Sequence, residues 1–233
     1  MIFEKGHLYH IYNQGNNRQR IFFSRENYLF FLEKIRKHVL PYADVLAWCL
    51  MPNHFHIMVY VNEVELVLPT QGLTRNKAAN SQTLSRQESQ GLTIRSVNTS
   101  QPLAKRTSSG CSQRTFNSSI GIMLRSYTRA INIQEKRSGA LFRQQTKANC
   151  LTCNDKITRA WFSSQGAARI NIQPTEDQYP NTCFNYINLN PVKAGLVKQC
   201  EDWEFSSYPD IVRLRNGKLI NRARIEEFGL VLL

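Results

Sequence analysis

The sequence predicts a mixed α/β protein with one main core. The first 61 residues carry the patterns of a strand, a helix and two further strands, and a tight turn joins the last two strands into a hairpin. A length of 233 residues is enough for one good core and a small appendage, but not for two full domains. A long polar stretch interrupts the pattern before helical periodicity returns.

Each element of this opening has a local signal. Alternating residues predict the first strand, and apolar residues at i, i+3, i+4 and i+7 predict a helix after an N-cap at Ser24. Pro41 ends this helix, and the turn at Met51–Asn53 separates the last two strands. The predicted elements are a strand at His7–Gln14, a helix to about His38, and strands at Ala43–Leu50 and His54–Val61.

The composition changes between about Pro69 and Ser119. Ser, Thr, Asn, Gln and Gly supply 30 of the 50 residues from Thr70 to Ser119, where seven basic residues face one acid, Glu88. Such a segment cannot bury enough apolar surface to offset the entropy lost on ordering. We therefore predict one domain formed by residues 1–68 and 120–233, with residues 69–119 as a flexible or partner-ordered insertion.

The second half has fewer signals. Helical periodicity returns at Ile120 and is predicted to end near Ser138–Gly139, where glycine favours a helix C-cap. A strand is expected within Ala140–Lys147, and the polar stretch Asn149–Pro180 has no clear pattern. The tail is predicted to be helical from Cys183 to a break at Asn190–Pro191.

The charge indicates a polyanionic partner. Thirty Lys and Arg against 17 Asp and Glu give a net charge of +13, and cations placed on phosphates gain affinity by releasing condensed counterions. No apolar run approaches the ~20 residues of a membrane span, and the first residues lack the order of a secretory signal peptide. We expect a cytoplasmic protein that binds nucleic acid, with no membrane partner.

The six cysteines fit such a compartment as free, mostly buried thiols. Cys150-Leu-Thr-Cys153 has the spacing of half a zinc site, but Cys183 and Cys200 stand too far apart to be a matching second pair. Structural zinc is therefore the less favoured interpretation.

His54-Phe55-His56 is the sharpest chemical feature. In a strand, residues i and i+2 share a face, so both imidazoles project together while Phe55 points to the other side. Two neighbouring imidazoles are a natural half-site for a divalent metal, with room for oxygen ligands. By spacing alone, a metal site and two ordinary polar residues at a strand end are equally good interpretations. The turn at Pro52-Asn53 fixes where the strand begins and favours the metal site.

Tyr127 is the second candidate. It shares a helical stripe with Leu124 and Ile131, which by itself favours a core aromatic. A phenol also acts as a covalent nucleophile where a metal or base stabilises the phenolate. Arg125 and Arg129 flank it on the same helix, which suits a phosphate substrate.

Five sequence blocks occur in an order that resembles a known family. They are Met51-Pro-Asn-His-Phe-His-Ile-Met-Val59, Ser126-Tyr-Thr-Arg-Ala-Ile-Asn132, Arg137-Ser-Gly-Ala-Leu-Phe142, Tyr186-Ile-Asn-Leu-Asn-Pro-Val-Lys-Ala-Gly-Leu-Val197 and Trp203-Glu-Phe-Ser-Ser-Tyr208. In this order the chain resembles the single-tyrosine HUH transposases, and the last two blocks especially resemble the REP-associated tyrosine transposase branch. The resemblance covers about residues 7–62 and 120–210.

The resemblance implies a fold, a chemistry and a substrate. The fold is a ferredoxin-like α+β fold, related to RNA-recognition folds, whose antiparallel sheet carries the two histidines at its centre. By resemblance, His54 and His56 ligate Mg²⁺ or Mn²⁺, and Tyr127 attacks the scissile phosphate of single-stranded DNA that carries a hairpin or palindrome. The product is a 5′-phosphotyrosine link and a free 3′-OH, so the protein is expected to be a DNA-cleaving strand transferase, a transposase. A homodimer is compatible with this activity.

The chain departs from the family pattern at one metal ligand. Relatives carry an amide one helical turn after the tyrosine, whereas Ile131 stands four residues after Tyr127 and cannot ligate a metal. Asn132 is the nearest substitute, about 100° further round the helix, and Gln134 lies two turns on. The candidate DNA contacts are Arg18, Arg20, Arg125, Arg129, Lys147 and Lys193.

Two alternatives to a transposase stay open. One is a non-catalytic module that binds single-stranded nucleic acid by charge and base stacking alone. The other is an HUH replication or relaxation nickase with the same histidine pair. Metal dependence separates catalysis from binding, because stacking and counterion release need no divalent ion.

Overall fold

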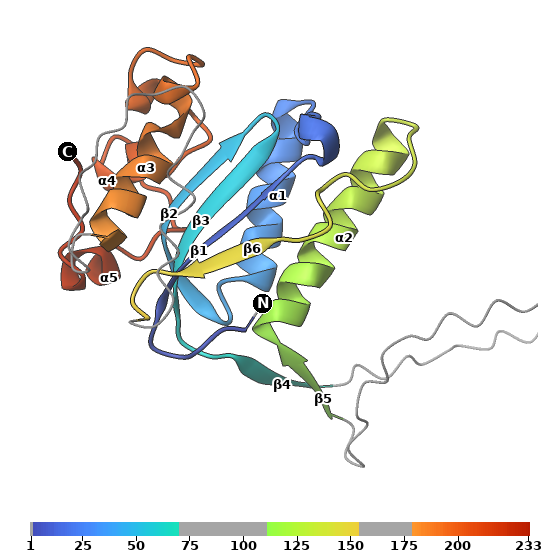
Figure 1. Cartoon of the computed structure of the whole chain (residues 1–233), viewed down its shortest axis with the longest axis horizontal. Coiled ribbons are helices and arrows are strands. Elements are labelled where there is room, and N and C mark those ends of the chain that lie inside the picture. Colours follow the sequence, from blue (N-terminus) through green and yellow to red (C-terminus); the bar gives the residue numbers. More distant parts are fainter. Residues whose placement is uncertain (1, 70–110, 154–178) are drawn as a thin grey trace, which may run out of the picture. The chain divides into compact units, whose positions relative to one another are not determined.

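A four-stranded antiparallel sheet in the order β2-β3-β1-β6 forms the centre of the fold (Figure 1). The computed structural model describes residues 2–69, 111–153 and 179–233. The chain divides into two compact units, residues 1–66 with 114–233 and residues 67–113, and the sheet and the candidate site lie in the first. None of the described helices is long and apolar enough to cross a membrane.

The described part of the chain holds the following strands and α-helices. The strands are β1 (Leu8–Gln14), β2 (Ala43–Met51), β3 (His54–Val61), β4 (Glu65–Pro69), β5 (Cys111–Thr115) and β6 (Lys147–Cys150). The helices are α1 (Arg25–His38), α2 (Phe116–Gln134), α3 (Tyr179–Lys193), α4 (Tyr208–Ile211) and α5 (Arg222–Glu227). The order β1-α1-β2-β3-α2-β6 with this sheet order is ferredoxin-like, so the fold class expected from the sequence is confirmed.

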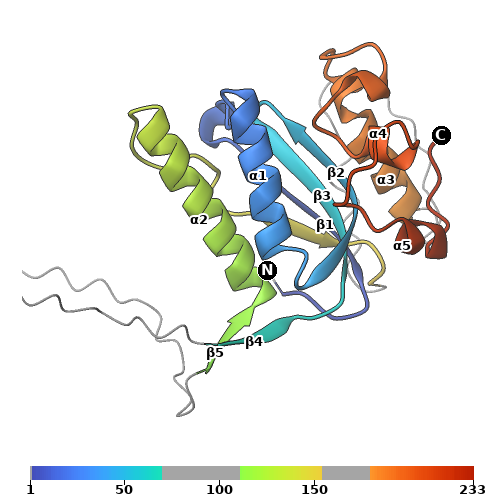
Figure 2. The ribbon, with the colours of Figure 1, turned by 180° about the vertical axis from the view of Figure 1, so that it is seen from behind.

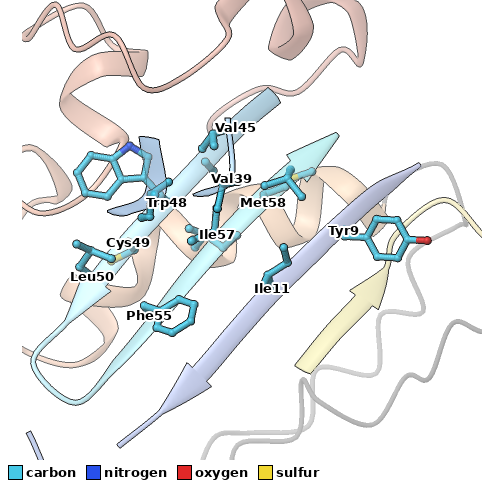
Figure 3. Packing of buried hydrophobic residues seen from close by; sticks show 14 of the residues in the cluster. Tyr9, Ile11, Val39, Val45, Trp48, Cys49, Leu50, Phe55, Ile57 and Met58 are labelled. Carbon is cyan, nitrogen blue, oxygen red and sulfur yellow. The ribbon is translucent and has the colours of Figure 1, made fainter. Parts of the chain in front are cut away.

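Helices α1 and α2 lie side by side on one face of the sheet, and α3 packs against β2 and β3 on the other (Figures 1 and 2). Strand alternation creates these two faces. Phe55 of β3 contacts Phe31 of α1, with ring centroids 5.1 Å apart. Ile11 and Ile57 face each other in the β1–β3 register and belong to the same core (Figure 3).

Three boundaries differ from the sequence expectations. Helix α2 begins at Phe116 rather than Ile120, because the Thr115 side chain accepts a hydrogen bond from the Ser118 backbone and caps the helix. Helix α3 continues through Pro191 to Lys193, because the proline removes only the N–H that would donate to the Ile187 carbonyl. Helical bonding goes on after it, since the Ala194 N–H donates to the Asn190 carbonyl at 3.0 Å.

The third difference concerns the last strand, which is Lys147–Cys150 and not Ala140–Lys147. Within the predicted segment, Phe142 forms only an isolated bridge with Gly15, and Leu141 and Phe142 are both buried in the core. Residues 111–119 also proved to be the strand β5 and the first helical turn, so the predicted polar insertion overlaps regular structure there. The rest of that prediction, residues 70–110, lies outside the described residues.

Tyr127 lies in the middle of an aromatic cluster between α1, α2 and the sheet. Its side chain is fully buried, and its ring packs edge-to-face on Phe31 at a centroid distance of 4.9 Å. The ring centroids of Phe22 and Phe142 lie slightly further from that of Tyr127, at 5.8 and 6.0 Å. The Tyr127 hydroxyl donates a hydrogen bond of 2.7 Å to the Ile21 carbonyl. This side chain therefore has a structural partner for its polar atom as well as for its ring.

Tyr127→Phe removes this hydroxyl and leaves the Ile21 carbonyl without a donor in the core. We expect the free energy of unfolding to fall by about 1–2 kcal/mol, measured by urea denaturation. Tyr208→Phe, at a half-buried tyrosine outside the cluster, is the control and should change stability by no more than about 0.5 kcal/mol. Equal losses in the two variants would contradict a structural role for the Tyr127 hydroxyl.

Candidate active site

The two histidines of strand β3 share the face of the sheet that α3 covers. His54 and His56 have ring centroids 5.0 Å apart, while Phe55 between them points into the opposite core. His56 is 5 % exposed and His54 is half-buried. Burial lowers the pKa of both imidazoles below the usual 6.5, so each ring is a neutral ligand with a lone pair at neutral pH.

Helix α3 brings a tyrosine and an asparagine to this histidine pair. The Tyr186 ring lies edge-on to His56, with centroids 5.4 Å apart. Asn190 follows one helical turn later, and its Oδ1 lies 3.4 Å from His54 Nε2. Burial raises the pKa of the Tyr186 phenol, and a hydrogen bond from the Asn190 amide acts in the opposite direction. The phenol is half-buried, in contrast to Tyr127.

The hydrogen bonds of the histidines point their outer nitrogens to a common space. His54 Nδ1 lies 2.6 Å from Asn53 Oδ1, an acceptor, so the proton of this ring belongs on Nδ1. His54 Nε2 and Asn190 Oδ1 are then two acceptors that face each other, an arrangement that a cation would satisfy. His56 Nε2 is buried and has no hydrogen-bond partner among the described residues. This donor set of two imidazole nitrogens and one amide oxygen suits a divalent transition metal such as Mn²⁺.

His10 of β1 holds His56 from behind. It is fully buried, and its Nε2 lies 2.9 Å from His56 Nδ1. The rings stack with centroids 5.0 Å apart. A second hydrogen-bonded group of this kind fixes the tautomer and orientation of a metal-binding histidine. With His56 donating from Nδ1, its Nε2 keeps the lone pair that a metal needs.

A cavity of about 230 Å³ opens beside these groups. His54, His56 and Tyr186 line it together with two cations, Arg143 and Lys147. The Lys147 Nζ lies 6.0 Å from the centre of the Tyr12 ring, which also lines the cavity. The cavity thus combines metal-binding atoms, a phenol and positive charge, which are the groups that phosphoryl transfer requires.

Tyr127 and Asn132 are not brought to this cavity. Tyr127 belongs to the core on the face of the sheet that Phe55 occupies, and burial raises the pKa of its phenol strongly. Asn132 donates its Nδ2 to the Gly139 carbonyl at 2.9 Å, which secures the loop after α2. The nucleophile and third ligand expected from the sequence therefore lie across the sheet from His54 and His56.

The predicted DNA contacts fall into three groups. Arg125 and Arg129 line a second, larger cavity of about 920 Å³ between α2 and the loop before β6. Lys147 lines the histidine cavity, and Lys193 lies with its Nζ 5.6 Å from the Tyr186 ring centre. Arg18 and Arg20 are exposed in the loop after β1 and line neither cavity.

The two cavities are neighbours. Asn13 and Arg143 line both of them, and the Asn13 amide donates to the Arg143 carbonyl and to Thr146 at 3.2 and 2.9 Å. The larger cavity also contains Lys136 and Arg137. We call the cations that line the two adjoining cavities the basic surface: Lys147, Arg143, Arg125, Arg129, Lys136 and Arg137.

Sequence analysis missed Tyr186, Asn190 and His10 as site residues. A signal was present for the first two, because the amide expected one turn after the tyrosine stands at Asn190 relative to Tyr186. The sequence analysis assigned the nucleophile to Tyr127 because two arginines flank it. His10 carried no separate signal, because its pairing with His56 depends on the register between β1 and β3.

Comparison with solved structures places the fold beside one class of protein. The chain is similar to the structure of a REP-associated tyrosine transposase bound to a REP hairpin, with a TM-score of 0.50 and 17% sequence identity. The match covers 91% of this chain and 83% of the other. No protein-family model matches the sequence, and no curated protein matches it. At this identity the likeness shows a shared fold.

The buried histidines predict a loss of stability in acid. Burial lowers the pKa of His10 from 6.5 to about 3. Below pH 6.5, therefore, His10 becomes protonated in the unfolded chain but stays neutral in the folded chain. The stability present above pH 6.5 is then lost as the pH falls towards 3, and His10 alone contributes a slope of up to about 1.4 kcal/mol per pH unit. Urea unfolding with chelator at several pH values measures this slope.

His10→Gln is expected to make this slope shallower, because glutamine does not titrate. His7→Gln, which replaces a half-exposed histidine just before the same strand, is the matched control for the histidine-to-glutamine change itself. Equal slopes in the wild type and His10→Gln would contradict the assignment of a neutral, buried His10.

Proposed function

We propose that this protein is a metal-dependent single-stranded DNA endonuclease and strand transferase of the HUH transposase type, and that Tyr186 is its nucleophile. The observation that carries the proposal is that Tyr186 lines one cavity with His54 and His56, while Asn190 Oδ1 lies 3.4 Å from His54 Nε2. The fold similarity to a hairpin-bound tyrosine transposase supports the same class of reaction and a hairpin-bearing DNA substrate.

Three side chains would hold the divalent ion: His54, His56 and Asn190. Bound there, Mg²⁺ or Mn²⁺ would polarise a non-bridging oxygen of the scissile phosphate and stabilise the charge that develops on it. His10 keeps His56 in the tautomer that can ligate, and Asn53 does the same for His54. The Asn190 amide is shared between this site and the phenol of Tyr186.

In the proposed reaction, Tyr186 Oη attacks phosphorus while the bond from phosphorus to the 3′ oxygen breaks. The phenol loses its proton, and the departing 3′ oxygen gains one. The products are a 5′-phosphotyrosine link and a free 3′-OH, as the sequence resemblance implies. The hydroxyl of another strand can reverse the step, so the bond energy is conserved and no nucleotide cofactor is required. Holding the phenol and phosphate together supplies much of the rate.

The basic surface provides a path for the DNA strand. Lys147 and Arg143 at the histidine cavity, followed by Arg125 and Arg129 at the larger cavity, offer cations for successive phosphates. Tyr12 beside Lys147 offers a ring for base stacking. These contacts are the DNA interface of the proposal, whereas Arg18 and Arg20 stand apart from it.

The first test is covalent capture of DNA. The protein is mixed with labelled, hairpin-bearing single strands from the DNA that flanks its gene, with Mn²⁺ or with chelator, and run on a denaturing gel. We expect a Mn²⁺-dependent band shifted by the mass of the protein, lost in Tyr186→Phe because the nucleophilic oxygen is absent. His56→Ala should lower its yield by at least tenfold, because a proposed ligand is removed.

Tyr127→Phe is the matched control, because it removes a phenolic oxygen from the other side of the sheet. It should still form the adduct at a temperature where it is folded. An adduct that survives in Tyr186→Phe and disappears in Tyr127→Phe would overturn the assignment of the nucleophile. Binding without an adduct or any metal dependence would favour the non-catalytic binding module.

The second test separates DNA binding from cleavage. Arg125→Ala and Arg129→Ala should each reduce the slope of log binding constant against log salt by about 1, because each removes one phosphate contact. Arg36→Ala, at an exposed arginine on α1 that lines neither cavity, is the control and should leave the slope unchanged. Filter binding of Tyr186→Phe protein measures all slopes without cleavage, and an unchanged slope in both variants would contradict the DNA path.

A further inference from the structure

A second group of metal-binding atoms lies where β1 and β6 meet, away from the candidate active site. One ligand atom each of His7, Cys150 and Cys153 lies within 4.8 Å of the others. His7 comes directly before β1, and the two cysteines end β6 and begin the loop after it. Within this group, His7 stands three residues before His10, which is about 10 Å along an extended strand. The group is therefore separate from the pair His54 and His56.

The backbone around these residues is well anchored. Leu151 donates its N–H to the Leu8 carbonyl at 2.8 Å, and the Thr152 hydroxyl accepts from the Leu8 N–H at 3.1 Å. The same hydroxyl lies 3.1 Å from His7 Nδ1. The His7 ring is thus held by the loop that carries the cysteines, as second partners orient a metal-binding imidazole.

Cys150 and Cys153 are joined as a disulfide, with Cα atoms 5.6 Å apart. A Cys-x-x-Cys pair at this separation can also place two thiolates on one tetrahedral ion. A disulfide needs no imidazole beside it, whereas an imidazole beside two thiolates completes three of the four ligands of a zinc site. His7, 143 residues earlier in the sequence, supplies the third ligand that sequence spacing alone did not reveal.

We propose that the reduced chain binds Zn²⁺ through Cys150, Cys153 and His7. Two thiolates and one imidazole form a ligand set that binds Zn²⁺ in preference to Mg²⁺. A carboxylate lies close to this group, since Glu4 Oε2 is 3.9 Å from His7 Nε2. Reduction of the disulfide by a phosphine takes two electrons from phosphorus and two protons from water, and it gives two thiols and the phosphine oxide. The thiols release both protons when they bind the ion.

Such an ion would fasten the edge strand of the sheet. Strand β6 has only four residues, and among the described strands it pairs with β1 alone. Its first residue, Lys147, lines the cavity of the candidate active site. A metal at the far end of β6 would fix this strand on β1 and with it the position of Lys147. The role is structural, and it does not depend on the proposed DNA chemistry.

Cobalt substitution tests the site. The full chain is reduced with a phosphine under nitrogen, freed of metal with a chelator, desalted and titrated with Co²⁺. We expect a thiolate-to-cobalt charge-transfer band in the near ultraviolet that saturates at one equivalent, is bleached by Zn²⁺ and persists in excess Mg²⁺. Cys150→Ser and Cys153→Ser should each lose most of it, and His7→Ala should weaken Co²⁺ binding by at least tenfold.

Two controls keep the result specific. Cys200→Ser removes a buried free thiol elsewhere and should retain the full band. The double variant His54→Ala/His56→Ala should also retain the charge-transfer band, because imidazoles give no thiolate charge transfer. Loss of DNA cleavage in that variant would therefore say nothing about the zinc site. Absence of the band in reduced wild type, its persistence in Cys150→Ser, or unchanged affinity in His7→Ala would each overturn the proposal.

Discussion

The alternation of side chains along β3 is the constraint on which the rest of the site depends. Phe55 packs in the core against Phe31 of α1, and strand alternation therefore places His54 and His56 on the opposite face of the sheet. A shift of one residue in the β1–β3 register would exchange the faces and place two imidazoles in an aromatic core. The hydrophobic core therefore positions the polar site, and the cost of misplacing Phe55 keeps the histidines in register.

On the α3 side of the sheet, the inner ring nitrogens of His54 and His56 each have a polar neighbour. His10 satisfies the inner nitrogen of His56, and Asn53 satisfies that of His54. The outer nitrogens and the Asn190 oxygen are acceptors gathered in one space. Buried acceptors that face one another are costly in a protein interior unless a donor or a cation lies between them. Such a cluster is the expected form of a site built for a ligand rather than for stability alone.

The two tyrosines illustrate how far sequence patterns extend. Tyr127 and Tyr186 both stand on helices among apolar neighbours, and both belong to blocks that resemble the transposase family. Periodicity correctly indicated that Tyr127 faces a core, but it did not say which face of the sheet that core covers. Only the packing of α1 and α2 on one side and α3 on the other separates the buried phenol from the one beside the histidines.

The sequence by itself determined the local elements, the shared face of His54 and His56, and the positive charge, because each depends on residue type and short-range spacing. It also carried the amide spacing of Tyr186 and Asn190. The tertiary structure decided which tyrosine meets the histidines, that His10 supports His56, and that His7 joins Cys150 and Cys153. These relations connect residues between 46 and 146 positions apart. They follow from strand register and helix placement, which are set by the burial of the whole core and leave no mark in a short stretch of sequence.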